Sequence, residues 1–254
     1  MCTKLANSNA DPAREVNVVR SFEERRVDGI VVTASRVGAV YMPMHSQMRV
    51  PIALINNQHP SEFARSVIIA NTEASLEITR YLIGLGHRRI AYIGDRFGYQ
   101  SDTERFGGYR DALNAADLAF QPELVVHGNG KPEGGEEAMA RLAALPERPT
   151  AVFCSNDMTA LGALRAIRTR GLSVPEDVSL AGFDDLFLAQ YTEPPLTTIR
   201  QPKHQMGRLA AETLLTILGG SKSTHNIQVP GELIVRQSTA PPREAREGSF
   251  SAIV

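Results

Sequence analysis

The sequence is poor in cysteine and lacks any long hydrophobic run. Only Cys2 and Cys154 occur among 254 residues, so a disulfide framework is not expected and a reducing cytoplasm fits the composition. No apolar segment approaches the ~20 residues that a membrane span requires. The first residues also lack the apolar core of a signal peptide, because Lys4 is soon followed by polar residues 7–9. Membrane proteins and disulfide-rich secreted domains are therefore excluded.

An excess of positive charge is also missing. Lysine and arginine total 27 and aspartate and glutamate 28, which gives a formal net charge of -1. Binding to a phosphate backbone needs clustered positive charge, so we expect no direct binding of nucleic acid by this chain alone. The basic stretch Gly86–Arg89 is interpreted as a solvated corner. The length fits one large domain or two small ones.

Signatures of catalysis and of cofactor binding are missing as well. The glycine-rich stretch 128–135 has neither the Walker nor the dinucleotide spacing and is interpreted as a surface loop. No G-x-S-x-G motif marks a hydrolase nucleophile. The six histidines never pair at i, i+3 or i+4, and no Cys–His cluster has zinc spacing. Cys154 ends an apolar run and is interpreted as a packed small hydrophobe. We expect no cofactor, no metal and no enzyme activity.

What the sequence does contain is an alternation of short apolar runs with amphipathic segments. The runs are typical of strands buried on both faces. The predicted strands are Gly29–Thr33, Pro51–Ile55, Arg89–Ile93, Leu124–His127, Ala151–Cys154 and Val178–Ala181. The predicted helices are one that opens at Asp11-Pro12, then Thr72–Leu85, Phe106–Ala116, Gly134–Leu145, Met158–Arg170 and Pro202–Leu218. This alternation predicts a doubly wound α/β fold.

Polar residues follow the carboxyl ends of four predicted strands. They are Asn56-Asn57, Asp95, Asn156-Asp157 and Asp184-Asp185. Ligands of open α/β sheets bind beyond these strand ends, and amides with carboxylates suit a neutral ligand that carries hydroxyls. Arg105 and Gln201 are candidates to complete the ring. The alternative is that these residues cap the helices that follow, which is the better interpretation for any single one of them.

Eight stretches of the chain resemble the sensor portion of the lactose-repressor (LacI/GalR) family of transcription regulators, in the family's order. They are RRVDGIVV (25–32), VPIALINN (50–57), GHRRIAYIGD (86–95), ERFGGYRDAL (104–113), AVFCSNDMTALGAL (151–164), VPEDVSLAGFDD (174–185), PPLTTIRQP (194–202) and ELIVRQST (232–239). Any one of these motifs is weak evidence, whereas all eight in order are strong evidence.

The resemblance implies the type I periplasmic-binding-protein fold: α/β, with two doubly wound parallel-sheet subdomains joined by three crossovers. We place the first subdomain at residues 1–70 plus 201–230 and the second at 71–200 plus 231–242, with a tail at 243–254. The family binds sugars, nucleosides or purines in the cleft between the subdomains, forms homodimers, and changes its affinity for DNA by hinge motion.

The resemblance also assigns the ligand-binding residues. Arg105 matches the family's ligand-clamping arginine, Asn156 its strand-end amide, and Asp184 the carboxylate that takes ligand hydroxyls. Phe183 matches the adjacent aromatic and Gln201 the crossover glutamine. Asn56 and Asn57 fall where sugar-binding relatives often carry an Asp-Arg pair, a difference that points to a neutral or a different ligand.

The start of the chain departs from the family pattern. Family members begin with a helix-turn-helix, a hinge helix and a first strand, whereas residues 3–8 (TKLANS) here resemble the second strand. We therefore expect an N-terminally truncated product or a mis-set gene start, which contacts operator DNA only through a missing helix-turn-helix. The first subdomain should then be the less stable one, since its sheet has lost a central strand.

Two functions remain open at this stage. The favoured one is the effector-binding and dimerisation module of a cytoplasmic, sugar-responsive regulator. The alternative is a sugar-binding solute receptor of a transporter, which needs export. A third class, an α/β enzyme, lacks a convincing catalytic set, because the adjacent residues Asp184 and Asp185 do not usually face one reacting atom.

Overall fold

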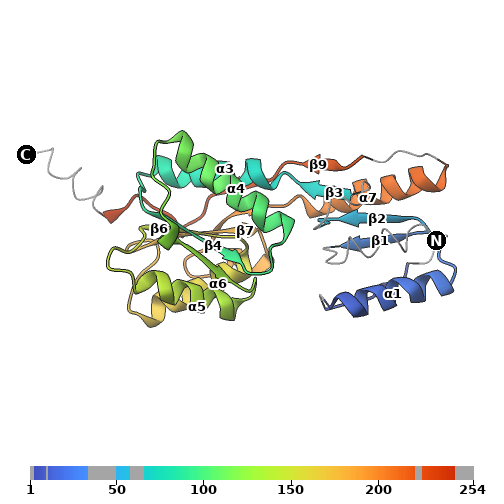
Figure 1. Cartoon of the computed structure of the whole chain (residues 1–254), viewed down its shortest axis with the longest axis horizontal. Helices are drawn as coiled ribbons and strands as arrows, with labels where there is room; N and C mark the ends of the chain where they lie inside the picture. Colours follow the sequence, from blue (N-terminus) through green and yellow to red (C-terminus); the bar gives the residue numbers. More distant parts are fainter. Residues whose placement is uncertain (1–2, 10, 34–49, 58–65, 221–224, 244–254) are drawn as a thin grey trace, which may run out of the picture. The chain divides into compact units, whose positions relative to one another are not determined.

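The structure, a computed structural model, describes residues 3–9, 11–33, 50–57, 66–220 and 225–243. The chain folds into two compact units (Figure 1). The first unit comprises Met1–Ala70 and Pro202–Val229, and the second comprises Asn71–Gln201 and Pro230–Val254. Among the described helices, none has the length and hydropathy needed to cross a membrane. Most of the predicted tail, from residue 244 on, lies outside the described residues.

The first unit contains a parallel sheet of four strands in the order β1-β2-β3-β9. Its elements are α1 (Pro12–Glu24), β1 (Ile30–Thr33), β2 (Ile52–Ile55), β3 (Ser66–Ile69), α7 (Lys203–Leu218) and β9 (Ile227–Val229). Helix α1 begins as predicted, because Asp11 Oδ1 accepts hydrogen bonds from Ala13 N at 2.9 Å and Arg14 N at 3.1 Å. Val19 of this helix packs in one apolar cluster with strand residues Ile30 and Ile52.

The segment that resembled a family strand forms no strand here. Residues 3–8 have no regular secondary structure, and Leu5 in the middle of the segment is 98% exposed. Because its one sizeable apolar side chain packs against nothing, the segment has no burial energy to hold it beside a sheet. The strand prediction for TKLANS is wrong.

The second unit is a six-stranded sheet covered by helices on both faces. The strand order is β10-β8-β7-β6-β4-β5, and every pair is parallel except β10 with β8. The strands are β4 (Ile90–Asp95), β5 (Val125–Gly128), β6 (Ala151–Cys154), β7 (Ser179–Asp184), β8 (Thr197–Arg200) and β10 (Glu232–Ile234). The helices are α3 (Asn71–Gly84), α4 (Gln100–Ala115), α5 (Pro132–Ala143) and α6 (Asp157–Thr169), with short 3-10 turns at Pro122–Leu124 and Phe187–Gln190. The doubly wound prediction is confirmed.

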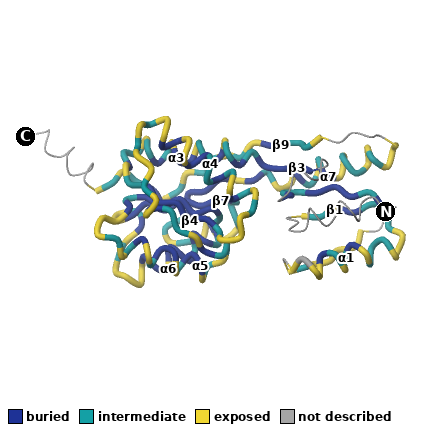
Figure 2. Tube along the Cα trace, in the orientation of Figure 1, coloured by how far each residue is buried: buried dark blue, intermediate teal, exposed yellow. Residues whose placement is uncertain are grey.

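The two faces of this sheet bury different side chains. Helices α3 and α4 pack together on one face, and α5 and α6 pack together on the other (Figure 1). Aliphatic residues fill the α5–α6 side, among them Ile93 and Leu180. Aromatic rings fill the α4 side, where Tyr92 contacts Tyr109 and Phe153 with centroids 5.4 Å apart in each pair. The central strands β4, β6 and β7 of this unit are buried almost throughout (Figure 2).

Several element predictions need correction at their boundaries. Helix α4 begins at Gln100 rather than at Phe106, so Arg105 lies inside the helix. Strand β4 continues to Asp95 and strand β7 continues to Asp184. The residues beyond each predicted strand end still pair with the neighbouring strand. Strands β3, β8, β9 and β10 were not predicted; β8, β9 and β10 are short and mix polar with apolar residues, so they form no apolar run.

The glycine-rich stretch 128–135 is only in part a loop. Its second half is the first turn of α5, which begins at Pro132. A Cβ at Gly135 would overlap the backbone of Thr159, and one at Gly162 would overlap the backbone of Pro132. These glycines are present because α5 and α6 approach each other too closely for any side chain between them.

The basic stretch 86–89 is also not simply solvated. His87 is buried, and its ring nitrogens lie 2.9 Å from Thr150 Oγ1 and 2.9 Å from the carbonyl oxygen of Ala240. The side chain therefore ties the start of β4 to the segment that returns after β10. Burial of a polar ring is tolerated here because both nitrogens have partners.

Candidate ligand-binding site

Arg105 is the centre of a polar cluster in the second unit. Its Nε donates a hydrogen bond to Asn71 Oδ1 at 2.8 Å, and its Nη1 donates to the carbonyl oxygen of Ser155 at 2.6 Å. Its Nη2 lies 3.9 Å from Asp184 Oδ1. The guanidinium is thus held by partners from α3, from the end of β6 and from the end of β7.

Phe183 lies beneath this guanidinium. The Cζ atom of Arg105 is 3.7 Å from the centroid of the Phe183 ring, which is a close cation–π contact. The ring itself is fully buried. Phe183 therefore presents no free face for stacking on a ligand and instead sets the height of Arg105 above the sheet.

Asp184 and Gln201 lie side by side at the ends of neighbouring strands. Gln201 Nε2 donates a hydrogen bond to Asp184 Oδ1 at 2.6 Å. Asp184 ends β7 and Gln201 follows β8, and these two strands pair in parallel. The structure therefore brings Arg105, Phe183, Asp184 and Gln201 together, and Asp184 lies at a strand end as predicted.

Two members of this cluster, Asn71 and Glu104, were missed by sequence reasoning. Asn71, the first residue of α3, binds Arg105 through its Oδ1 and donates from its Nδ2 to Glu104 Oε2 at 2.8 Å. A signal for Asn71 was present, since it follows the apolar residues Val67–Ala70 in the same way that Asn56 follows its strand. It was overlooked because β3 had not been recognised.

Asn156 caps a helix, which was the alternative to a ligand-binding role in the sequence analysis. Its Oδ1 accepts a hydrogen bond from Thr159 N at 2.7 Å, which caps α6. Its Nδ2 donates a long hydrogen bond of 3.4 Å to the carbonyl oxygen of Gly130. Asp95 is similarly occupied, since its Oδ1 accepts from Phe97 N at 2.7 Å.

Asn56 and Asn57 lie in the first unit, directly after β2. Asn56 has a left-handed backbone with φ 51°, a conformation that asparagine tolerates better than most residues. Asn57 is buried. Contact of these two side chains with a ligand stays a prediction.

Asp157 is the buried carboxyl group of this region. Its Oδ1 accepts a hydrogen bond from Thr198 Oγ1 at 2.6 Å, and its Oδ2 accepts from Leu186 N at 2.7 Å. Burial raises the pKa of Asp157 to about 7, and the nearby charges of Asp184 and Asp185 add to this, while the two hydrogen bonds oppose it. Asp157 therefore titrates near neutral pH without facing solvent.

The cluster offers hydrogen-bond donors and acceptors with both signs of charge. The guanidinium of Arg105 is positive, the carboxylates of Glu104 and Asp184 are negative, and the amides of Asn71 and Gln201 are neutral. Such a set suits a neutral ligand with several hydroxyl or amide groups. Within the described residues, no group of three or more histidines, cysteines or carboxylates is placed to hold a metal ion.

This fold and this cluster define a small-molecule-binding protein built from two α/β units. Residues 79–239 match the family described as periplasmic binding protein-like domain. The HTH-type transcriptional repressor PurR of Haemophilus influenzae is 33% identical over 238 residues, which are 92% of this chain and 71% of the relative. The chain belongs to the LacI/GalR family of transcriptional regulators and corresponds to their effector-binding domain.

Solved structures agree with this assignment. The transcription regulator CcpA of Lactococcus lactis has a TM-score of 0.84 and 31% identity, over 92% of this chain and 86% of that one. A complex of the transcriptional regulator CelR with cellobiose has a TM-score of 0.81 and 32% identity, over 89% of this chain and 70% of that one. The predicted family and fold class are confirmed.

Proposed function

We propose that this chain senses a small, neutral, polar effector through Arg105 and the groups around it. The observation that carries the proposal is the orientation of Arg105. The guanidinium stacks on Phe183 and is bound by Asn71 and Ser155, while Nη2 stays directed towards Asp184. A charged side chain held in this way, at the carboxyl ends of parallel strands, is pre-organised for a ligand.

The charge balance narrows the class of effector. One guanidinium beside two carboxylates does not favour an anion, whereas Asp184 can accept hydrogen bonds from ligand hydroxyls. We propose a sugar, a polyol or a nucleoside. The cellobiose bound to CelR, one of the relatives, supports the sugar. Asn56, Asn57 and Asn156 are proposed as further ligand contacts, Asn156 through the Nδ2 that is only weakly engaged.

The effector acts on transcription in this proposal. The relatives are repressors, so we propose that ligand binding shifts the affinity of the complete regulator for operator DNA in the cytoplasm, without catalysis. Operator DNA would be bound through a helix-turn-helix, not by the described units.

We also propose a homodimer. The exposed cluster of Phe187, Leu188 and Tyr191, whose two rings lie 4.8 Å apart, supports an apolar interface.

A thermal melt against a panel of sugars, polyols and nucleosides, cellobiose included, tests the effector proposal. A ligand at 100 times its Kd stabilises the folded chain by about 2.7 kcal/mol, which raises the Tm by a few degrees. We expect one class of compound to do so. The variant Arg105→Lys should lose this rise, because a lysine cannot bind Asn71 and Ser155 simultaneously and stack on Phe183.

The matched control is Arg110→Lys, an exposed arginine on the same helix. This variant should keep the full ligand-induced rise in Tm. Equal rises for the wild type and for Arg105→Lys would contradict the proposed site. The solute-receptor alternative is less favoured because the relatives are transcriptional repressors, and secretion of the complete protein would revive it.

A further inference from the structure

The turn that follows β7 has an unusual backbone. Asp184 has φ 115° and Asp185 has φ 47°, so two consecutive residues other than glycine lie at positive φ. Each costs free energy, of order 1–3 kcal/mol where the conformation is sparsely populated, and persists only where the surroundings hold it. The first of the two residues is Asp184, whose carboxylate faces Arg105 and Gln201.

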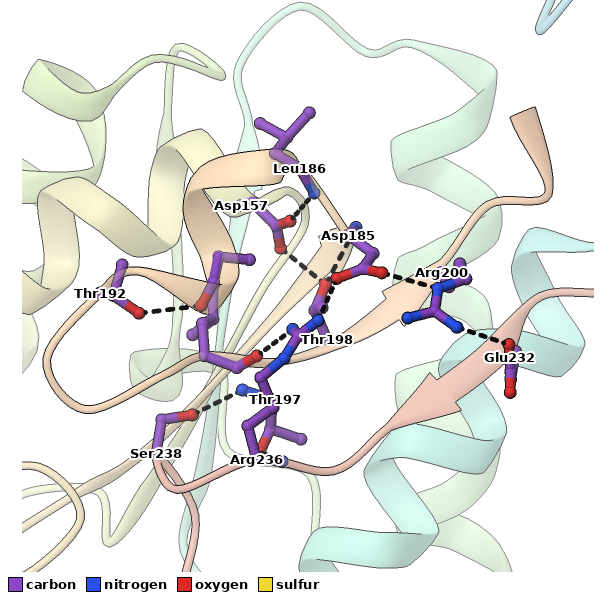
Figure 3. A network of polar contacts seen from close by, with 12 residues as sticks. Asp157, Asp185, Leu186, Thr192, Thr197, Thr198, Arg200, Glu232, Arg236 and Ser238 are labelled. Carbon is purple, nitrogen blue, oxygen red and sulfur yellow. Dashed lines mark hydrogen bonds and ion pairs between the residues drawn. The ribbon is translucent and has the colours of Figure 1, made fainter. Parts of the chain in front are cut away.

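Asp157 holds the peptide groups of this turn. Its Oδ2 accepts directly from Leu186 N at 2.7 Å. Its Oδ1 accepts from Thr198 Oγ1 at 2.6 Å, and that hydroxyl in turn accepts from Asp185 N at 3.4 Å. One buried carboxylate therefore fixes two successive backbone amides, one directly and one through a threonine, as Figure 3 shows.

Close packing also restricts the position of the Asp157 side chain. It is buried as the first residue of α6, and a Cβ on Gly182 would overlap its Oδ1. Glycine at 182 is therefore what allows the carboxylate to lie against β7. The ligand-site residues Arg105 and Gln201 make no hydrogen bond to Asp157 in the described part of the chain.

Two arginines hold the carboxylate of Asp185, the second aspartate of the turn. Asp185 Oδ2 accepts from Arg200 Nε at 2.7 Å, and its Oδ1 accepts from Arg236 Nη2 at 2.6 Å. Arg200 also contacts Glu232 Oε2 at 3.2 Å (Figure 3). The arginines hold the Asp185 carboxylate, and Asp157 holds the backbone amides of Asp185 and Leu186. This arrangement directs the Asp184 carboxylate towards Arg105.

We infer that Asp157 is a positioning residue of the ligand site: its carboxylate fixes the turn 184–186, directs Asp184 towards Arg105, and loses this hold when protonated. Protonation at Oδ1 reverses the bond with Thr198, whose hydroxyl hydrogen is then left without its acceptor. Ligand affinity should therefore rise with pH. This inference deepens the proposed function and rests on it for the effect on affinity.

The charges around Asp157 allow the change to occur near neutral pH. Burial raises its pKa to about 7, and Asp184 and Asp185 raise it further through their negative charges. Cys154 of β6 also interacts with it, and burial raises the pKa of that thiol so that it stays neutral. The cations Arg200 and Arg236 lie on Asp185. The Nη2 atom of Arg105 lies 3.9 Å from Asp184 Oδ1. Asp157 therefore titrates near physiological pH.

An NMR titration of the ¹⁵N-labelled full chain between pH 5.5 and 8.5 tests the inference. The signals to follow are the backbone amide of Leu186 and the Nε–H of Arg105. In the wild type both should shift with one midpoint near 7. In Asp157→Asn, whose amide imitates the protonated carboxyl, both should stay at the wild-type low-pH positions. No midpoint in the wild type, or unchanged midpoints in Asp157→Asn, would overturn the inference.

Thr198 supplies a second pair of variants in case Asp157→Asn folds poorly. Thr198→Ser keeps the hydroxyl and should keep the titration of Arg105 Nε–H. Thr198→Val removes the hydroxyl and should abolish it. With the compound that raises the Tm in the panel, we expect about tenfold weaker binding at pH 5.5 than at 8.5, and no such difference in Thr198→Val.

The two proposals fail separately. If both NMR signals titrate but no compound of the panel binds, the proposed effector class is overturned and the positioning role is supported. A ligand that binds Asp157→Asn as tightly as the wild type at pH 8.5 overturns the positioning role alone.

Discussion

Arg105 and Asp157 show how differently two buried charges are treated in this protein. Around the buried guanidinium of Arg105, Asn71, Ser155 and the ring of Phe183 take the place of water. Asp157 receives two hydrogen bonds but no cation from the described part of the chain, and its charged neighbours Asp184 and Asp185 are also negative. Its carboxylate is therefore destabilised in the folded chain.

This difference predicts the pH dependence of stability. The pKa of Asp157 is about 7 in the folded chain and 3.8 when it is exposed, so the folded state binds the proton more tightly. The contribution of Asp157 to the free energy of unfolding is fully present below pH 4 and falls as pH rises towards 7. The loss is at most about 4 kcal/mol. Urea unfolding of the wild type and of Asp157→Asn between pH 4 and 8 measures it.

We expect Asp157→Asn to have a flatter pH profile and to be the more stable of the two at pH 8. Asp177→Asn is a matched control, because the partly exposed carboxylate of Asp177 also accepts a hydrogen bond from a backbone amide, that of Ser173. A wild-type profile as flat as that of Asp157→Asn would show that burial does not raise this pKa.

At the scale of elements, glycine decides how the helices of the second unit pack. Gly135 and Gly162 let α5 and α6 come into backbone contact, and Gly108 does the same for α4 against Thr72 of α3. The contact at Gly108 holds α4 against α3, and α4 carries Arg105. Helix packing is thus connected with the geometry of the ligand site.

A pair of glycine substitutions tests this packing. Gly162→Ala should destabilise the chain by about 1–3 kcal/mol, because the added methyl group meets the backbone of Pro132 and the helices must separate. Gly107→Ala on α4 adds its methyl group to open space and should stabilise by about 0.5–1 kcal/mol through helix propensity. Thermal or urea unfolding measures both. Equal effects of the two would show that α5 and α6 are not in close contact.

At the scale of the whole molecule, the two units differ in the size of their sheets. Within the described residues, the first unit has four strands and the second has six. In the first unit β1 ends the sheet, and its Val31 is 41% exposed. In the second unit the central strands β4, β6 and β7 are buried almost throughout.

Hydrogen exchange should therefore distinguish the units. We expect the amides of β1 and β2 to exchange faster than those of β4, β6 and β7, because less apolar surface protects them from local opening. Mass spectrometry of peptides after deuterium labelling measures this. Equal protection of both units would contradict the expectation, and with it the prediction that the first is less stable.

Local sequence patterns sufficed for the parts of the fold that depend on local physics. Asp11-Pro12 predicted the start of α1, because the capping carboxylate binds only backbone amides two and three residues along the chain. The run AVFC predicted β6 to the residue because a strand buried on both faces is apolar throughout. The strand-end residue Asp184 was found for the same reason, since position at a strand end can be read along the chain, whereas the role of Gln201 was implied by the family resemblance.

Other features depended on which segments meet in space. The partnership of Asn71 with Arg105, the ring of Phe183 beneath the guanidinium, and the anchoring of Leu186 by Asp157 join residues from different elements. Residues 3–8 resembled a strand but are coil, because a strand needs a neighbour and no sequence pattern guarantees one.

The sequence by itself therefore determined the family, the α/β class and the candidates at the strand ends. Only the tertiary structure decided which candidates share a site, which cap a helix and which carboxyl group is buried. The physical reason is that hydrogen bonds and desolvation act over a few ångströms in space, whereas a sequence records distance only along the chain.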